Sequence, residues 1–554
     1  MSRQIVHESF DLEDSWPQRL LHIPTMTSQP WQPGNTYGET KTPKYNVLSY
    51  TWGRWEDKTG LSGAEPLKIE GISRKIPAIY PDHFTTLQFQ AALQAAVQDH
   101  DVDHVWLDVA CINQKEHSLE MATEIGRQAL IFGRAKKCYV WLNRQDTKQL
   151  QDTSTRLKRL EDAQNLDEFS FNDAVDVLEC LTVNPWFTSL WTLQEAHVVS
   201  DAIFISKYAE SVTYGGLESE RFSLLDVLRT CSAVLRKFDV NQRVQRATDT
   251  TGAHRFKSLV YKSGFIALYN AINPMGLLSA SNFREVGPER VNDRVYGIMQ
   301  VFGFQLGISN PAAPAGKSFT LQELESEMGV ALIKEYPLVS QMHVFDTPPP
   351  KGTAWHISRY SFVIRNLDAI TYRALINRNR ETRTHLNSRS YNGQLLGFFT
   401  GVTIAFQKLF QACQRVGPRK KSFLSTKTFG KRRQILALDK SLILEQYGFP
   451  PQHFDRTRYV SHQDAHIGDC EKLLEAFAHR ELTVLLMGRE TSPEHKKWLF
   501  GILLLKESDD SQWARIGIFI WFADAPVQGQ VDALDQAILT GQSSGWVLRE
   551  GFFG

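Results

Sequence analysis

The sequence has few cysteines, none of them closely spaced, and no long apolar run. Its six cysteines are far apart in the 554 residues, and no Cys-x-x-Cys pair occurs. This spacing predicts buried or free thiols in a reducing compartment rather than a disulfide framework. The most apolar stretches, 395–406 and 498–506, are shorter than the roughly 18 apolar residues of a membrane span. The first residues also lack the basic and apolar segments of a signal peptide, so we expect a soluble cytoplasmic protein with no membrane span.

Net charge is also nearly absent, because 62 basic side chains are offset by 61 acidic ones. A dedicated nucleic-acid binder usually has a clear basic excess, so the charge balance argues against nucleic acid as the main partner. One local exception is the basic cluster within 415–433. A solvated loop explains it most simply, but a nuclear-import signal or a phosphate-binding patch is the alternative interpretation.

The length and composition predict more than one folded unit. Hydrophobic residues make up 42% and charged residues 22% of the chain, which is enough apolar material for large cores. We expect an irregular N-terminal extension at 1–40 and an α/β domain at 41–215. A helical middle region at 216–345 and an α+β C-terminal region at 346–554 follow, and a Pro/Ala/Gly-rich linker is expected at 310–318.

Strand and helix patterns alternate in the predicted α/β domain. They indicate a strand at 45–50 and a hairpin at 67–76 around Glu70-Gly71. A buried strand is expected at 105–112 and another strand at 138–143. Before each of these two strands a helix is expected, the first with Phe84, Leu87, Ala91 and Ala95 on one face and the second with Met121, Ile125, Ala129 and Phe132 on one face. Polar residues 144–170 predict a loop with some helix. Helices around 174–181 and 186–197 and a strand at 202–206 complete the pattern. This alternation predicts a mostly parallel sheet with helices on its faces.

Beyond residue 215 the patterns are weaker. Helices are expected at 220–240, 258–272 and 320–336. In the last third, the apolar segments 500–506 and 514–522 are joined by a polar turn, which predicts a pair of adjacent strands.

Three segments give the sequence its strongest likeness to a known family. They are LSYTWG (48–53), WLDVACINQKEHSLE (106–120, continuing to 143) and NPWFTSLWTLQE (184–195), and a weaker fourth is NDRVYGIMQVFG (292–303). Together they resemble the fungal heterokaryon-incompatibility (HET) domain. The resemblance implies a part in the cell death that follows fusion of genetically unlike fungal cells.

The chain departs from the family pattern at several positions. Ser189 stands where the third block usually has arginine. Glu124, Gln128 and Phe132 stand where glutamine, methionine and tyrosine are usual. These changes leave the fold expectation unaltered, but they bear on any charge network that the family shares.

The HET domain is in turn remotely similar to the TIR fold, a parallel sheet flanked by helices, and this likeness implies a candidate catalytic residue. TIR members that cleave NAD carry a glutamate within a Ser-x-Trp-x3-Glu pattern. Ser189, Trp191 and Glu195 stand at that spacing. The resemblance therefore implies Glu195 as the catalytic carboxylate, NAD as a substrate rather than a cofactor, and homo-oligomer formation on activation by an unknown incompatibility partner protein.

The chemistry of such a site needs few groups. Nicotinamide leaves as a neutral base, so one carboxylate against the ribose can stabilise the cationic transition state without a general acid. Tyr50 or Trp52 would supply an aromatic wall for the base, and Gly53 would let the backbone approach the ligand. The remaining rim candidates are Asp108, Asn113 and Gln114, because sites of parallel sheets lie at the carboxyl ends of the strands.

Other interpretations of the same residues stay open. Glu195 can be an ordinary helix carboxylate paired with a base, the tryptophans can be core residues, and Asp108 can hold loop amides. The polar segment 461–470 matches no zinc pattern, so no metal is expected.

Three mechanisms remain: an NAD-cleaving enzyme, a non-enzymatic scaffold that signals by homotypic assembly, and activity of the C-terminal region through the basic cluster within 415–433. In the first, the C-terminal region would also act as a restraint or sensor.

Overall fold

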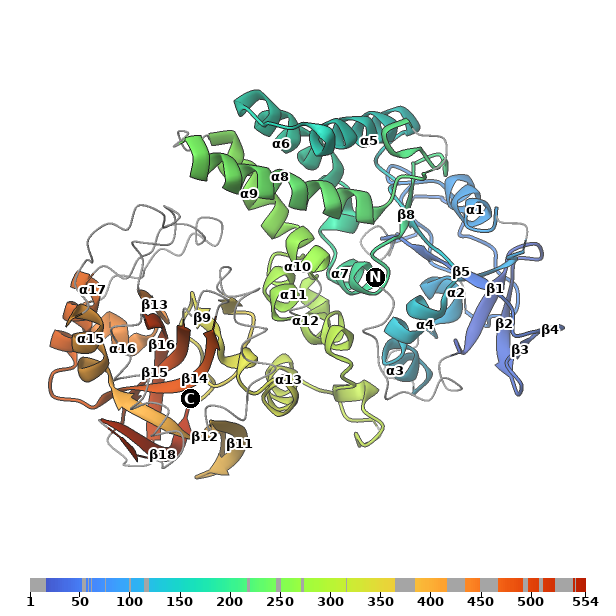
Figure 1. Ribbon diagram of the computed structural model, residues 1–554. Coiled ribbons are helices and arrows are strands. Elements are labelled where there is room, and N and C mark those ends of the chain that lie inside the picture. Colours follow the sequence, from blue (N-terminus) through green and yellow to red (C-terminus); the bar gives the residue numbers. More distant parts are fainter. Residues whose placement is uncertain are drawn as a thin grey trace. The chain divides into compact units, whose positions relative to one another are not determined.

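The computed structural model divides the chain into two compact units, residues 1–324 and 325–554, each described by itself below (Figure 1). The structure describes residues 16–51, 56–57, 59–60, 62–74, 76–98, 101–113, 119–216, 220–245, 251–270, 274–314, 316–363, 384–415, 434–448, 467–491, 497–507, 512–523, 542–543 and 545–554. The four regions expected from the sequence, 1–40, 41–215, 216–345 and 346–554, remain predictions as domain boundaries.

A sheet with a parallel centre organises the first unit. Its parallel strands are β5 (Tyr45–Ser49), β6 (His104–Trp106), β7 (Cys138–Trp141) and β8 (Ile203–Ile205), in the spatial order β6-β5-β7-β8. Almost every residue of these strands is buried, as the apolar runs predict. The chain passes from β5 to β6 on one side and then crosses to β7 on the other. Such a reversal creates a crevice beyond the carboxyl ends of β5 and β7, where open α/β sheets bind ligands.

The N-terminal extension is not irregular in its described part. It forms β1 (Arg19–His22), β2 (Thr27–Gln32), β3 (Thr36–Tyr37) and β4 (Thr40–Lys41), which continue the sheet as antiparallel strands. Strand β1 pairs with the free edge of β6. The prediction failed because these strands are short, from two to six residues, so that no sustained alternation of apolar and polar residues marks them in the sequence.

The hairpin expected at 67–76 is also wrong for its described residues. Glu70 instead forms an isolated bridge with Thr27, through hydrogen bonds from Ser28 N to Glu70 O and from Glu70 N to Met26 O, both 2.9 Å. Gly71 has φ of 76°, and a Cβ there would lie 2.5 Å from the carbonyl oxygen of Ser28. The Glu70–Gly71 turn therefore docks on β2 rather than joining two strands.

Helix α1 (Thr86–Ala95) confirms a predicted helix but not its buried face. A capping box at Thr85 begins the helix, so Phe84 lies before it. Phe89, Ala92 and Leu93 are buried, whereas Leu87 is 76% exposed. The prediction counted the helical repeat from Phe84, which lies before the helix. The predicted buried face is therefore rotated about the helix axis relative to the observed one.

The strand expected at 105–112 ends at Trp106. A helical turn, α2 (Asp108–Cys111), follows, with the amides of Ala110 and Cys111 donating to Leu107 O at 2.9 and 2.7 Å. A short apolar run cannot distinguish a strand from a buried helical turn, which explains the error. The turn gives Asp108 a place at the end of β6 instead of inside it.

The next predicted helix is present as two pieces, α3 (Leu119–Ile125) and α4 (Gln128–Arg134). The side-chain oxygen of Gln300 accepts a hydrogen bond of 2.6 Å from Ala129 N in the first turn of α4. A side chain from far along the sequence thus satisfies a donor at the break.

Residues 144–170 are mainly helical rather than a loop. They contain α5 (Thr147–Asp162) and the start of α6 (Glu168–Thr182). Asp146 caps α5 through a capping box, and a narrow stripe that includes Leu150 and Leu157 is buried. The stripe is too thin in an otherwise polar segment to stand out in the sequence. Helix α7 (Leu190–Val198) follows a 3-10 turn at Pro185–Phe187.

Further helices complete the first unit. They are α8 (Leu224–Gln245), α9 (Thr251–Lys262), α10 (Phe265–Asn270), α11 (Pro274–Ser281) and α12 (Asp293–Tyr296), with a 3-10 turn at Met299–Phe302. The helix predicted at 220–240 is present as α8. The helix predicted at 258–272 is divided in its described part into α9 and α10, because the chain turns at Gly264, where φ is 77°. Helix α13 (Leu321–Glu335) spans the division between the units.

The second unit is built mainly on antiparallel strands. Its larger sheet contains β11 (His385–Tyr391), β12 (Gln394–Ala405), β13 (Gln434–Leu438), β14 (Leu482–Thr491), β15 (Lys497–Lys506), β16 (Gln512–Ala523), β17 (Gln542–Ser543) and β18 (Trp546–Phe553), and a smaller one pairs β9 (His343–Phe345) with β10 (Ser361–Val363). One pairing in the larger sheet, between β16 and β18, is parallel. The pairing of β15 with β16 confirms the predicted strand pair. Helices α15 (Phe406–Arg415), α16 (Leu442–Gln446) and α17 (Ile467–Ala476) contribute to an apolar core with these strands. Among the described helices of the chain, none is long and apolar enough to cross a membrane.

Candidate functional site

Three elements of the first unit bring acidic and hydroxyl side chains to one edge of the sheet. Ser49 and Tyr50 stand at the carboxyl end of β5, and Asp108 follows β6. Glu195 lies on α7 and accepts a hydrogen bond of 2.5 Å from the hydroxyl of Ser49. This is the edge at which a parallel sheet presents its ligand site.

Glu195 has two neutral hydrogen-bond donors. Ser49 Oγ donates to Oε2, and Gln128 Nε2 donates to Oε1 at 3.1 Å. Among the described residues no cation pairs with this carboxyl. Burial raises the pKa of Glu195 to about 8; the hydrogen bond from Ser49 opposes that rise, and the negative charge of Asp108 adds to it. The carboxyl is therefore poised to change charge near neutral pH.

Asp108 and Tyr50 form the other half of the site. The Tyr50 hydroxyl donates to Asp108 Oδ1 at 3.0 Å, and Val109 N donates to the same oxygen at 2.6 Å. Burial, with the charge of Asp108 next, raises the pKa of Tyr50 well above its usual value, so the phenol stays protonated. Asp108 is partly exposed and acts electrostatically on Glu195.

The N-terminal strands help to hold the turn that carries Asp108. Ser28 Oγ, on β2, donates to Ala110 O at 2.9 Å, and Arg19 Nε on β1 donates to Ser28 Oγ at 2.9 Å. Arg74 donates to Val109 O at 2.8 Å and also to Ile112 O. The carbonyls of α2 are thus fixed by side chains from outside it, which sets the position of Asp108.

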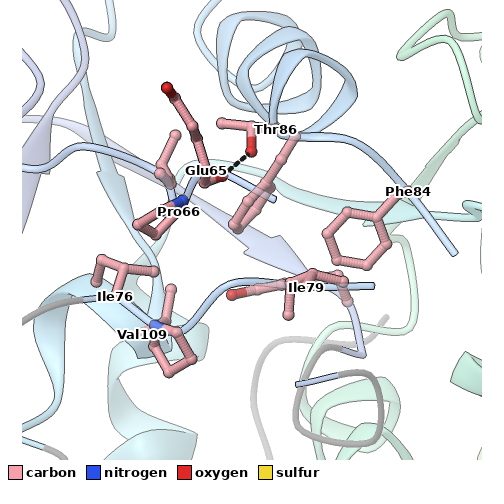
Figure 2. Close-up of a pocket in the computed structure, with 11 residues that line it drawn as sticks. Glu65, Pro66, Ile76, Ile79, Phe84, Thr86 and Val109 are labelled. Atoms are coloured by element: carbon pink, nitrogen blue, oxygen red, sulfur yellow. Dashed lines mark hydrogen bonds between the residues drawn. The ribbon is translucent and has the colours of Figure 1, made fainter. Parts of the chain in front are cut away.

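A small apolar cavity lies beside Tyr50 (Figure 2). Its volume is about 20 Å³, and its lining includes Pro66, Ile76, Ile79, Phe84 and Val109. At its rim the Thr86 hydroxyl donates to Glu65 O at 2.5 Å. A cavity of this size holds about one water molecule, so a nucleotide would require the surrounding side chains to move.

The structure places the remaining predicted site residues differently. Asn113 donates to Glu120 Oε2 at 2.6 Å in an exposed pair. The Trp191 indole donates to Asp293 Oδ2 at 2.9 Å, and Ser189 forms a backbone bridge with Glu285. Tyr50, Asp108 and Glu195 are thus brought together, whereas the side-chain partners found for Asn113 and Trp191 lie outside this group.

Several predicted residues lie outside the described part of the chain. Trp52, Gly53 and Gln114 belong to this group, as does most of the basic cluster within 415–433. The polar segment 461–470 is described only from residue 467 onward. Among the described residues, no group of three or more His, Cys, Asp and Glu side chains could hold a metal ion.

Sequence reasoning missed Ser49, Trp186 and Gln128 as neighbours of the catalytic candidate. The Trp186 indole donates to Ser49 Oγ at 2.6 Å, and Ser49 in turn donates to Glu195. Two signals were available: Ser49 lies directly before Tyr50 in the first block, and Gln128 is a polar residue at a buried helix position.

The comparisons with known proteins bear on this same region. Residues 45–195 match the family model described as heterokaryon incompatibility protein (HET). No curated protein and no solved structure matches the chain. The match confirms the predicted HET domain over these residues, which begin with β5 and end with Glu195. The likeness to the TIR fold stays a prediction.

Proposed function

We propose that the first unit, through its HET domain, acts in fungal heterokaryon-incompatibility cell death by cleaving the nicotinamide–ribose bond of NAD in the cytoplasm. The match to the HET family supports the biological role. The observation that carries the enzymatic part is Glu195, a carboxyl at the ligand edge of a parallel sheet that has neutral donors on both oxygens.

Glu195 would act as an anion beside the ribose. Breaking the bond to nicotinamide builds positive charge on the sugar, and a fixed carboxylate stabilises that charge more strongly in the transition state than in the ground state. The electron pair of the bond leaves with nicotinamide, which becomes neutral. Water then adds to the ribose and releases one proton to the solvent. Because burial raises the pKa of Glu195 to about 8, the active ionised fraction would grow between pH 6 and 9.

Asp108 and Tyr50 would shape the same site. Asp108 is held by Tyr50 and by the amide of Val109, so its charge has a fixed position. A second anion near the sugar adds to the stabilisation of a cationic transition state. The Tyr50 ring also lines the adjoining cavity, which places an aromatic surface beside the carboxyl groups.

The small cavity implies that activity requires a rearrangement. Ligand pockets usually measure ~300–1,000 Å³, far more than the cavity beside Tyr50. We infer that assembly of several copies on activation opens the site. Such control would protect the host cell from continuous loss of NAD.

Nicotinamide release from NAD by the full chain tests the proposal. The parent would be compared with Glu195→Gln at several protein concentrations and pH values. The matched control is Glu179→Gln, which changes a half-exposed carboxyl on α6 that pairs with Arg255. We expect Glu195→Gln to lose roughly 10²–10³-fold of the rate, as removal of one electrostatic group from a site does, and the control to keep it.

The scaffold alternative predicts a different result. If the full chain assembles and kills cells but releases no nicotinamide, and Glu195→Gln kills equally well, NAD cleavage is refuted. The HET domain would then signal through its contacts alone.

A further inference from the structure

A chain of three glutamines reaches Glu195 from outside the HET-matched segment. Gln300 N donates to Gln194 Oε1 at 3.1 Å, Gln194 Nε2 donates to Gln128 Oε1 at 3.4 Å, and Gln128 Nε2 donates to Glu195 Oε1 at 3.1 Å. Gln128, Gln194 and Gln300 are all buried, with 6%, 1% and 6% of their surfaces exposed. The first donor belongs to the 3-10 turn Met299–Phe302, about 100 residues beyond the end of the family match.

The first donor, Gln300 N, determines the direction of every hydrogen bond in this series of glutamines. A backbone N–H can only donate, so the oxygen of the Gln194 amide must face Gln300. The NH₂ group of Gln194 then faces Gln128 and requires the oxygen of that amide. The NH₂ group of Gln128 is left to face Glu195. Amide orientations that are otherwise ambiguous are therefore fixed by one main-chain donor.

The other oxygen of Glu195 is constrained in the same way. The Trp186 indole N–H can only donate, and it lies 2.6 Å from Ser49 Oγ. Ser49 accepts there with one lone pair, and its hydroxyl donates its single proton to Glu195 Oε2. Both carboxyl oxygens thus receive donors whose direction is set by remote groups, and these donors favour the carboxylate form and oppose part of the rise in pKa that burial causes.

Gln300 also ties the relay to the surrounding helices. Its side-chain oxygen accepts from Ala129 N at 2.6 Å, and its Nε2 donates to Ile125 O. The segment around 299–302 is therefore anchored at the break between α3 and α4, directly before the helix that carries Gln128.

We propose that Gln300, Gln194 and Gln128 form a positioning relay that presents Glu195 with fixed donors and makes the 299–302 turn part of the functional site. None of the three touches the substrate in this scheme; they act through Glu195. The proposal rests on the proposed NAD cleavage for its catalytic meaning, but the relay itself is a property of the folded unit. It also implies that the functional unit extends past residue 195 to at least residue 302.

Two substitutions at Gln194 test the relay in the full chain. Gln194→Met keeps the volume and removes the link, so the Gln128 amide becomes free to turn its oxygen toward Glu195 and to favour the protonated acid. Gln194→Glu still accepts from Gln300 but cannot donate to Gln128, which reverses the relay. We expect the pH midpoint of nicotinamide release to rise by roughly 0.5–1 unit in the first variant and further in the second.

The matched control is Gln145→Met. Gln145 is a buried glutamine of the same unit, 2% exposed, whose amide donates to Cys180 O at 2.9 Å and lies outside the relay. It reports what the loss of any buried glutamine does to the enzyme. Its pH midpoint should equal that of the parent.

A second measurement does not depend on activity. The infrared carboxyl absorption of each variant, recorded against the same variant with Glu195→Gln, follows the protonation of Glu195 as the pH changes. The same order of midpoints is expected: parent and control lowest, Gln194→Met higher, Gln194→Glu highest.

The outcomes separate the two proposals. Equal infrared midpoints in the parent and both Gln194 variants, or an equal rise in the control, would overturn the relay. If the full chain releases no nicotinamide under any condition, the proposed enzymatic function fails. The infrared titration then still decides whether the relay exists.

Discussion

Asp439 in the second unit is a buried carboxyl group and Glu195 in the first is a partly buried one, and their partners differ in kind. Asp439 is 2% exposed and lies 2.6 Å from the guanidinium of Arg515, which is itself 2% exposed. Among the described residues Glu195 has only neutral donors, and the charge of another acid, Asp108, acts on it. Asp439 is thus neutralised by a cation, whereas the described partners of Glu195 are neutral.

The partners of the Asp439–Arg515 pair indicate a structural role. Asp439 accepts from Phe345 N at 3.0 Å, and Arg515 donates to the carbonyls of Gln341 and His343. The pair therefore fastens β9 to the large sheet of the second unit through β16. Burial raises the pKa of Asp439, and the charge of Arg515 opposes that rise.

A second paired acid stands within the first unit itself. Glu124 is 1% exposed, lies 3.0 Å from Arg127, and accepts from the Trp106 indole and from Gln18 N. Like Asp439, it holds an adjoining segment, here the start of the N-terminal strands. The difference between paired and unpaired acids thus separates structural from chemical candidates within one unit as well as between units.

The largest expected effect comes from breaking the structural pair. Arg515→Met leaves Asp439 buried without its cation, which costs about 3–5 kcal/mol in comparable sites. We expect hydrogen–deuterium exchange to accelerate strongly in peptides from 343–345 and 512–523 and to stay unchanged in peptides from the first unit. Arg515→Met combined with Asp439→Leu should recover most of the protection, because the unpaired charge is gone. A double variant as unstable as the single one would contradict the assignment.

The next effect is a pH-dependent gain of stability on removing the unpaired acid. The pKa of Glu195 is raised from 4.5 to about 8, so the folded state holds its proton more tightly than the unfolded state between those values. This contribution to stability is complete below pH 4.5 and is lost as the pH rises through 8. Glu195→Gln cannot titrate and keeps its stability at alkaline pH.

Protection of α7 and β5 against hydrogen–deuterium exchange measures this difference. We expect Glu195→Gln and the parent to be similar at pH 5, and the variant to be more protected at pH 9 by roughly 1–4 kcal/mol. The control Glu179→Gln should follow the parent at both values. A parent that is better protected than Glu195→Gln at pH 9 would show that Glu195 is stabilised as an anion, contrary to this assignment.

The sequence predicts the centre of the first unit well because its strands are continuous apolar runs. The runs at 45–50, 138–143 and 202–206 contain β5, β7 and β8. The rule that sites lie at the ends of parallel strands predicts the position of Asp108, whereas Glu195 was implied by the family resemblance. The prediction of secondary structure fails at 105–112, because half of that apolar run is a helical turn. It also fails at α5, whose buried stripe is too narrow to interrupt a polar segment.

The hydrogen-bond partners of Glu195 are beyond sequence reasoning for a different reason. Ser49 is 146 positions from Glu195 and Gln128 is 67, and Gln300 is 106 positions from Gln194. No periodic pattern connects residues so far apart. Only the packing of α4, α7 and the 299–302 turn brings three glutamines into line, so the relay could be recognised only in three dimensions.

The smallest expected effect tests whether the two acids of the first unit act on each other. Asp108→Asn keeps an acceptor for Tyr50 and for Val109 N but removes the negative charge that raises the pKa of Glu195. The pH midpoint of Glu195, followed by its infrared carboxyl absorption, should therefore move toward acid, by less than about 1 unit. Asp176→Asn, which changes an exposed acid on α6, should leave it in place. A midpoint that stays fixed in Asp108→Asn would mean that burial alone sets the charge of Glu195. Glu195 would then differ from Asp439 because no cation pairs with it among the described residues, and not because a neighbouring anion raises its pKa.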